Sequence, residues 1–346
     1  MKEKKEIIEA FRTHHRFVIT SHRNIDGDGL GSMLATFFWL KDEGKEVFMV
    51  QDGTVPYFYQ FLPGKEEVLT PQEFYSLSFS SNPEVVIVLD CSHPQRLGKL
   101  EELCNKASLL VNIDHHPDNA CFGNINWVVP NSSSTALLVY ELIKEAGIKI
   151  NSSMAVNLLT GFVTDTGGFQ FVDMDSHLLR VVEDLIVSGA SLAQIMHYAF
   201  HFRRKEALKL LGRALDHLFY DENFRFSVIY LTRKDFADCG AQEEDSEGIV
   251  DYGLYIPGAE LSLLFKEVEE GCFRVSLRSQ GEKDVLPIAH YFGGGGHHKA
   301  AGFRIQGDLS QVKEEVLDVV RKSLSDSSSL IKEVEKDSAR RDTECL

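Results

Sequence analysis

The alternation of apolar and polar residues divides the chain into two regions. Up to about residue 190, short apolar runs rich in β-branched residues alternate with amphipathic helical stretches. The pattern predicts strands at 17–20, 47–50, 85–89 and 109–113, and helices at 3–14, 29–43 and about 135–146. Strands that alternate with helices usually pair in parallel, so we expect an α/β domain with a mostly parallel, doubly wound sheet.

The second region has more closely spaced strands joined by short turns. Strands are expected at 214–220, 224–231, 260–268 and 272–279, and helices at 285–292 and 310–324. This spacing favours a smaller α/β domain with a mixed sheet. The predicted domains are residues 1–190 and 214–325, and a continuous helical pattern over 191–213 predicts a helical connector. Residues 326–346 are rich in serine and charge and predict a flexible tail.

The charge of the chain limits the ligands that it can hold. With 52 acidic and 36 basic residues, the formal net charge is −16. Binding long nucleic acid on a broad surface requires many lysines and arginines to neutralise phosphates, so we expect no long nucleic acid as a partner. A short phosphorylated substrate remains compatible, because a few local cations and a metal could hold it.

Cysteine usage and hydropathy indicate the compartment. The six cysteines include no C-x-x-C pair, so they read as isolated thiols of a reducing compartment. The charged start M-K-E-K-K lacks the apolar core of a signal peptide, and no apolar run approaches membrane-spanning length. We therefore expect a cytoplasmic protein with no membrane partner.

Several predicted strands end on residue types that commonly bind metals in proteins. The run S-L-L-V-N-I is followed by Asp114, His115 and His116, and the 85–89 strand is followed by Asp90. The carboxyl ends of parallel strands meet at one edge of a sheet, where open α/β folds bind ligands. We expect these side chains to lie together.

The complete set of such residues predicts a metal centre. It consists of His22, Asp26, Asp28, Asp90, Asp114, His115, His116 and Asp165. Any one aspartate after a strand is more often a helix cap, but so many carboxylates placed together would raise one another's pKa without a cation. Mixed oxygen and imidazole ligands suit manganese, with iron, cobalt or zinc as alternatives.

Five motifs in order resemble the DHH phosphoesterase superfamily over roughly residues 15–310. They are H-R-N-I-D-G-D-G-L-G-S (22–32), V-L-D (88–90), D-H-H (114–116), T-D-T-G (164–167) and G-G-G-G-H-H-K-A-A-G (293–302). The resemblance implies a DHH catalytic domain followed by a DHH-associated substrate-binding domain. The chain departs from the usual pattern at Asn24-Ile25 and at Ala136-Leu137. Neither departure is expected to touch a metal ligand, but both are expected near the position of a substrate, so they bear on substrate preference.

The resemblance also assigns roles to individual residues. It implies two divalent metal ions, expected to be manganese, with Asp90 bridging them. One ion would be held by His22, Asp26 and Asp90, and the other by Asp28, Asp90, His115 and Asp165. His116 would lie near the scissile phosphate, and Asp114 would orient the histidines.

The second domain is expected to bind a phosphate of the substrate. Gly294, Gly295 and Gly296 precede His297, which matches the histidine of the family motif, and such a glycine run can hold a phosphate through its N–H groups. A glycine run can also be a flexible loop. Arg278 resembles the family arginine that reaches a terminal phosphate, a task that suits a guanidinium, although it could be a surface strand residue.

Within the superfamily, the two-domain layout resembles the nanoRNase/pAp-phosphatase group. That resemblance implies a phosphodiesterase that hydrolyses short oligoribonucleotides, or linear dinucleotides such as pApA, to nucleoside monophosphates. It also implies removal of the 3′-phosphate of pAp and suggests a homodimer. The alternatives are a cyclic di-AMP phosphodiesterase and a nucleotide-binding sensor without turnover.

Overall fold

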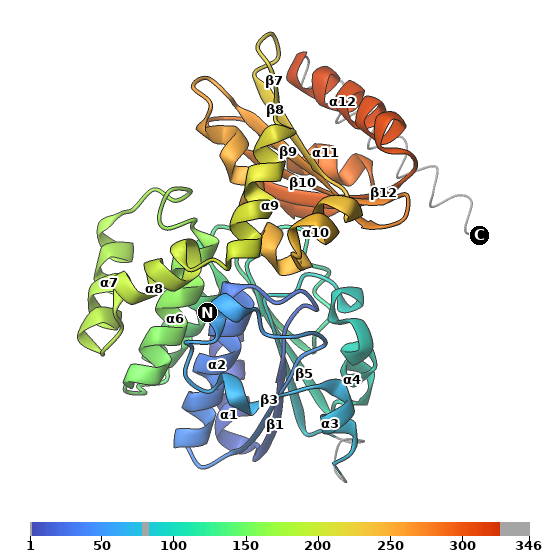
Figure 1. The fold of residues 1–346 in the computed structure, drawn as a ribbon. Helices are drawn as coiled ribbons and strands as arrows, with labels where there is room; N and C mark the ends of the chain where they lie inside the picture. The colour runs from blue at the N-terminus through green and yellow to red at the C-terminus, as the bar shows by residue number, and fades with distance from the viewer. Residues whose placement is uncertain (1, 78–82, 326–346) are drawn as a thin grey trace. The chain divides into compact units, whose positions relative to one another are not determined.

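A computed structural model describes residues 2–77 and 83–325 of the chain. The chain forms two compact units, Met1–Phe202 and Arg203–Leu346 (Figure 1). The tail predicted at 326–346 lies outside the described residues. Among the described helices, none combines the length and the apolar character that a bilayer span requires.

The first unit is built on sheet A, in which every neighbouring pair of strands is parallel. The strand order is β3-β2-β1-β4-β5-β6. The strands are β1 (Arg16–Thr20), β2 (Glu46–Val50), β3 (Val68–Leu69), β4 (Val85–Leu89), β5 (Leu109–Asp114) and β6 (Ile125–Val128). The predicted parallel sheet is confirmed.

Helices cover both faces of sheet A (Figure 1). One face packs on α1 (Lys2–Thr13), α2 (Gly27–Asp42) and α5 (Thr135–Glu145). Outside these, α6 (Ser152–Asp165) packs against α2 and α5, and α7 (Ser176–Val187) and α8 (Leu192–Met196) pack against α6. The other face packs on α3 (Pro71–Tyr75), the 3₁₀ segment η3 (Pro94–Leu100) and α4 (Glu101–Lys106). Because both faces are covered, the strands read as continuous apolar runs; all five residues of β4 are buried.

The strand order changes direction between β1 and β4, which pair in register from Phe17–Val85 to Thr20–Val88. At such a switch point the loops that follow the two strands diverge to opposite faces and leave a crevice at the carboxyl edge. The loop after β1 carries the H-R-N-I-D-G-D motif, and β4 is followed directly by Asp90.

The second unit contains a mixed sheet, sheet B, as predicted. Its order is β11-β12-β10-β9-β8-β7, with β8 and β9 parallel and the other pairs antiparallel. The strands are β7 (Phe219–Asp221), β8 (Phe226–Leu231), β9 (Leu261–Glu269), β10 (Cys272–Ser279), β11 (Gly295–His297) and β12 (Ala300–Gln306).

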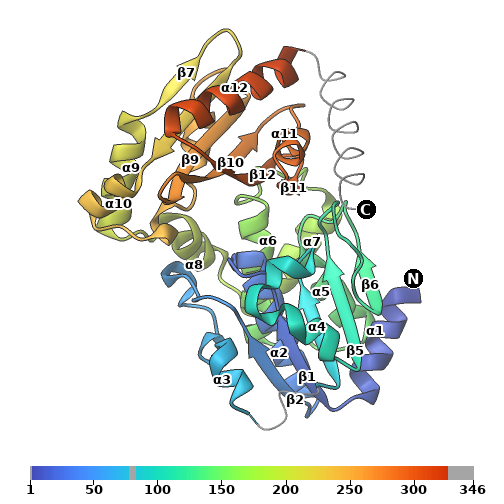
Figure 2. The same ribbon diagram turned by 90° about the vertical axis from the view of Figure 1, so that its right-hand side faces the viewer.

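The two faces of sheet B are covered by different helices (Figure 2). One face packs on α11 (Leu286–Tyr291) and α12 (Leu309–Ser325). The β8–β9 half of the other face packs on α9 (Lys205–Asp216) and η6 (Ile249–Tyr255), and the short α10 (Arg233–Cys239) and η5 (Glu243–Ser246) belong to the same unit. Among the described residues, the apolar side chains packed between this second face and its helices come from β8 and β9, and none comes from β10, β12 or β11.

Two predicted elements are wrong. Residues 214–220 are not a strand, because α9 continues to Asp216 and β7 begins only at Phe219. The 191–213 helix is interrupted: a π-helical turn, η4 (His197–His201), is followed by extended backbone at Phe202 and Arg204. Aromatic packing accounts for the break, since the Phe202 ring lies 6.1 Å from Tyr57, and Tyr198 stacks at 4.7 Å on Phe61.

Close packing of α2 against α6 places two candidate ligands together. A Cβ atom on Gly31 would lie 2.3 Å from the backbone oxygen of Asn157, and one on Gly161 would lie 2.9 Å from Oδ1 of Asp28 in α2. Real atoms do not approach so closely, so both glycines are required. Asp28 in the first turn of α2 and Asp165 at the end of α6 depend on this contact for their separation.

We therefore predict that Gly31→Ala destabilises the first unit by about 1–3 kcal/mol, the usual range for overpacking a filled core. Trp39 and Trp127, the two tryptophans of the chain, both lie in the first unit, so tryptophan fluorescence follows its unfolding. The denaturation midpoint should fall.

Gly212→Ala is the matched control, because a Cβ on this helical glycine meets no atom within 4 Å. The tryptophan midpoint of Gly212→Ala should equal that of the parent. An unchanged midpoint for Gly31→Ala as well would contradict the described contact between α2 and α6.

Candidate metal centre

The loop after β1 is held by Asp26, which serves both as a helix cap and as a site residue. Asp26 Oδ1 accepts the N–H of Asp28 at 3.1 Å and of Gly29 at 3.0 Å, which caps α2. Its second oxygen lies 3.6 Å from Nε2 of the buried His22. The cap therefore occupies one oxygen and leaves the other aimed at the histidine.

Asp90 lies between two histidines at the end of β4. Its Oδ2 is 3.6 Å from Nε2 of His22, and its Oδ1 is 3.6 Å from Nε2 of His115. The backbone of Asp90 is left-handed, with φ of 54°, a conformation that aspartate and asparagine tolerate better than most residues. The Thr135 hydroxyl donates to Asp90 Oδ1 at 3.0 Å.

Asp28 and Asp165 approach His115 from two helices. Asp28 is buried and accepts the N–H of Thr135 at 2.6 Å and of Ala136 at 2.8 Å, in the first turn of α5. His115 Nε2 lies 3.8 Å from Asp28 Oδ2 and 3.4 Å from Asp165 Oδ2. A helix N-terminus favours a carboxylate, and here it holds one at the centre of an acidic cluster.

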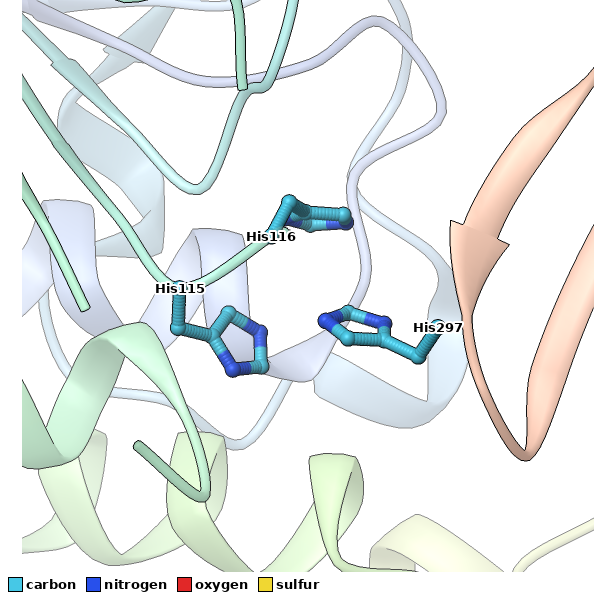
Figure 3. Close-up of side chains that lie close together, drawn as sticks. All are labelled: His115, His116 and His297. Carbon is cyan, nitrogen blue, oxygen red and sulfur yellow. The ribbon is translucent and has the colours of Figure 1, made fainter. Parts of the chain in front are cut away.

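Hydrogen bonds orient the side chains of the D-H-H motif. Figure 3 shows the rings of His115 and His116. Nδ1 of His115 donates to the carbonyl of Ser132 at 3.0 Å, so its Nε2 faces the carboxylates. Nδ1 of His116 lies 2.8 Å from Asp114 Oδ1, and Asn119 donates to the other oxygen of Asp114 at 2.6 Å. Asp114 is therefore engaged by neighbouring groups, which fits an orienting role better than a ligand role.

Mutual charges shift the pKa values of these buried groups. Burial disfavours a charged His22, but Asp26 and Asp90 outweigh it and raise its pKa to about 9. Burial likewise opposes Asp165, Asp90 and Asp28, which raise the pKa of His115 to about 10. Burial and the Asp90 charge raise the pKa of Asp28 well above its usual value, and burial is the largest cause that raises that of Asp165 to about 6.

The donor atoms fit a metal centre. His22, Asp26 and Asp90 form one group, and Asp28, His115 and Asp165 form another; within each group the donor atoms lie within 4.8 Å of one another. Oxygen and imidazole donors of this kind suit a transition-metal ion. The raised pKa values of Asp28 and Asp165 support the same conclusion, since a cation would offset the burial and the mutual repulsion that raise them.

Sequence reasoning missed Arg96, which lies beside this cluster. Its Nη1 is 3.3 Å from Nε2 of His116 and 3.3 Å from the hydroxyl of Ser92. The side chain is exposed, and within the described ranges no ion pair with a carboxylate is present. Its one signal in the sequence is an arginine six residues after Asp90, outside the five motifs.

Two of the predicted substrate residues of the second unit, Arg278 and His297, lie on one face of sheet B. Register pairs His297 with Ala300 and Ala300 with Arg278, so Arg278 and His297 stand two strands apart in one cross-strand row. Figure 3 labels His297 on β11. Arg278 Nε lies 3.6 Å from the largely buried Asp251, a carboxylate that restrains the guanidinium.

The glycine run is more ordered than a flexible loop. Gly295, Gly296 and His297 form β11, paired with β12. A Cβ on Gly294 would meet the carbonyl oxygen of Gly302 at 2.2 Å, and one on Gly296 would meet that of Ala300 at 2.5 Å. Both glycines are therefore needed for the strands to approach.

Comparison with known proteins bears on this arrangement. The model of the DHH family N-terminal domain matches residues 16–162, and that of the DHHA1 domain matches residues 226–326. The bifunctional oligoribonuclease and PAP phosphatase NrnA of Thermus thermophilus is 35% identical over 308 residues, 89% of this chain and 90% of that protein.

Two further relatives match this chain over different shares of their own length. An exopolyphosphatase-related protein from Bacteroides fragilis superposes with a TM-score of 0.86 at 25% identity, covering 94% of this chain and 98% of that one. The cyclic-di-AMP phosphodiesterase GdpP of Bacillus subtilis is 27% identical over 84% of this chain, but the match spans 45% of that protein. Matched domains, their order and the full-length similarity together show that this chain belongs to the DHH family.

Proposed function

We propose that the protein is a metal-dependent phosphodiesterase that hydrolyses short oligoribonucleotides, or linear dinucleotides such as pApA, to nucleoside monophosphates. The observation that carries the proposal is the convergence of four aspartates and two histidines at the carboxyl edge of sheet A. The full-length similarity to an oligoribonuclease and PAP phosphatase supports this substrate class, and removal of the 3′-phosphate of pAp is part of the proposal.

The proposed ligands fall into two sets that share Asp90. His22, Asp26 and Asp90 would hold one divalent ion, and Asp28, Asp90, His115 and Asp165 the other, with manganese as the expected metal. Such ions, when bound, activate water and neutralise charge on a phosphoryl group. The chain itself orients these ligands. The Ser132 carbonyl accepts a hydrogen bond from His115, and the N-terminus of α5 donates one to Asp28.

His116 and Arg96 are proposed to act on the phosphate itself. Asp114 fixes the His116 ring through Nδ1, which directs Nε2 to the site, where it could protonate the leaving oxygen. Arg96 reaches the same nitrogen and can stabilise charge that develops on the phosphate. Arg278, Gly294, Gly295, Gly296 and His297 are proposed to hold a terminal phosphate of the substrate.

The alternative substrate is cyclic di-AMP, favoured by the similarity to GdpP over most of this chain. The two readings share the chemistry and differ in the substrate. The deciding assay presents oligoribonucleotides of two to about fifteen residues, pAp and cyclic di-AMP with manganese. Rapid loss of the shortest oligoribonucleotides supports our proposal, whereas loss of cyclic di-AMP alone would replace it with the alternative.

Asp90→Asn should lower kcat roughly a thousandfold, equivalent to about 4 kcal/mol of transition-state stabilisation, because both proposed ions lose their shared carboxylate. Asparagine tolerates the left-handed backbone, so circular dichroism should show an intact fold. Asp173→Asn, at an exposed position of the same unit, is the control and should retain parental kcat. Parental turnover by Asp90→Asn would exclude the bridging role.

Metal binding should release protons. Without metal, the pKa values of about 9 for His22 and about 10 for His115 keep both imidazoles protonated at pH 8, whereas a ligating imidazole must be neutral. Because both values exceed the ordinary 6.5, protonation stabilises the metal-free fold fully below pH 6.5, and this stabilisation is lost as pH rises through 9 and 10. Metal affinity should rise over the same interval.

Titration calorimetry in buffers of different ionisation enthalpy measures the released protons. His22→Gln should release fewer protons at pH 8 than the parent, and His290→Gln, at an exposed position of the second unit, should match the parent. Heats that do not depend on the buffer would contradict the assignment of His22 and His115 as ligands.

Arg96→Gln should lower kcat roughly a hundredfold, equivalent to about 2.7 kcal/mol, because a cation near the reacting phosphate acts mainly on the transition state. Arg96→Lys should recover part of this loss, since it restores the charge without the bidentate geometry. Steady-state kinetics on a dinucleotide separates kcat from KM. A rise confined to KM would reassign Arg96 to ground-state binding of the substrate.

A further inference from the structure

The face of sheet B that carries Arg278 also carries three other cations. Arg274 on β10 stands directly opposite Lys266 on β9 and Arg304 on β12. Residues that are opposite across neighbouring strands project to the same face. Since Arg274 and Arg278 are four residues apart on one strand, all of these side chains share the face of Arg278 and His297. We refer to Lys266, Arg274 and Arg304 as the cation row.

The cation row is incompletely neutralised. Glu243 on η5 lies 3.0 Å from Nζ of Lys266 and 3.9 Å from Nη1 of Arg274. Within residues 203–325, as far as they are described, no carboxylate lies within the 4.0 Å ion-pair distance of Arg304. Glu247 also acts on Lys266 through its charge, so two carboxylates face three positive charges, and an excess of positive charge remains in a chain whose net charge is −16.

Like charges placed directly across strands destabilise a sheet, so the cation row needs an explanation beyond folding. Burial and the charge of Arg274 lower the pKa of Lys266, which is the mark of this repulsion. The Lys266 side chain is 11% exposed, whereas that of Arg274 is 40% exposed and Arg304 is exposed. The positive charge is therefore presented to solvent at Arg274 and Arg304.

Between the cation row and Arg278 runs a row of small residues, Ser276, Gly302 and Gly295, paired across β10, β12 and β11. Nothing larger than a hydroxymethyl group projects from these three positions, so a ribose or base can lie against the sheet there. Four residues along an antiparallel strand span about 14 Å, which separates Arg274 from Arg278 by more than one nucleotide.

We propose that the cation row is a second phosphate subsite, which binds the backbone of oligoribonucleotides longer than a dinucleotide. This inference rests on the proposed function and extends it: Arg278 and His297 hold one phosphate of any substrate, and the cation row holds a phosphate farther along the chain. A dinucleotide is too short to engage both. The cation row thus favours oligoribonucleotides of about three to five residues over dinucleotides.

The test compares two charge-matched double variants in the full-length chain. Arg274→Gln/Arg304→Gln removes the exposed part of the cation row. Lys313→Gln/Lys322→Gln removes two cations from α12, which packs on the opposite face of sheet B. Both are made with and without Asp90→Asn, so that binding of a labelled pentaribonucleotide can be measured by fluorescence polarisation without turnover.

Loss of the cation row should weaken pentaribonucleotide binding roughly tenfold and reduce the slope of log affinity against log salt by about 0.7 per lost phosphate contact. The ratio of kcat/KM for the pentaribonucleotide to that for the dinucleotide should fall by a similar factor. Arg278→Ala, in contrast, should weaken both substrates. The α12 variant should keep the parental ratio and salt slope.

The outcomes separate this proposal from the function on which it rests. If the parent hydrolyses the pentaribonucleotide but the cation-row variant keeps the parental affinity, salt slope and ratio, the second subsite is excluded and the enzyme function stands. If the parent hydrolyses no oligoribonucleotide, the proposed function fails, and binding to Asp90→Asn still decides the subsite. A purely structural cation row would instead lower the unfolding midpoint of the variant, with the salt slope unchanged.

Discussion

The candidate centre depends on the position of one carboxylate, that of Asp90. Its left-handed backbone lets the chain leave β4 while the side chain turns toward the edge of the sheet, with one oxygen facing His22 and the other facing His115. Because β1, β4 and β5 are adjacent and parallel, the residues that follow them meet there without any long-range adjustment. The Thr135 hydroxyl restrains the same carboxylate from α5, so sheet and helix layers together define its place.

An acidic cluster of this density is costly to fold, and neighbouring groups reduce the cost. The N-terminus of α5 donates two backbone N–H groups to Asp28, and the first turn of α2 donates two to Asp26. Imidazolium charges on His22 and His115 offset the rest in the metal-free state. The tight contact at Gly31 and Gly161 then fixes the distance between α2 and α6. The geometry of the centre therefore depends on helix packing as well as on the residues of the motifs.

Much of the fold could be predicted from the sequence, because buried parallel strands appear as apolar runs and their polar ends mark the sheet edge. The candidate site was predictable to the extent that its residues lie in motifs at those ends. Arg96 was not, since its approach to His116 depends on the path of η3. The break in the helix at Phe202 could not be predicted either, because the helical periodicity of the sequence continues through it. Aromatic packing with Tyr57 overrides the local preference for helix.

The cation row illustrates why some candidate sites can be found only from coordinates. Lys266, Arg274 and Arg304 are scattered over 39 positions of sequence and belong to no common motif; only the register of β9, β10 and β12 brings them together. The net charge of −16 does not indicate that three cations stand side by side on one face of sheet B. Carboxylates gather at the candidate metal centre, and basic side chains gather on the face of sheet B that we propose as a phosphate subsite. The local placement of charge, rather than its sum, therefore shows how a chain with a net charge of −16 can carry both a cluster of carboxylates and a local group of cations.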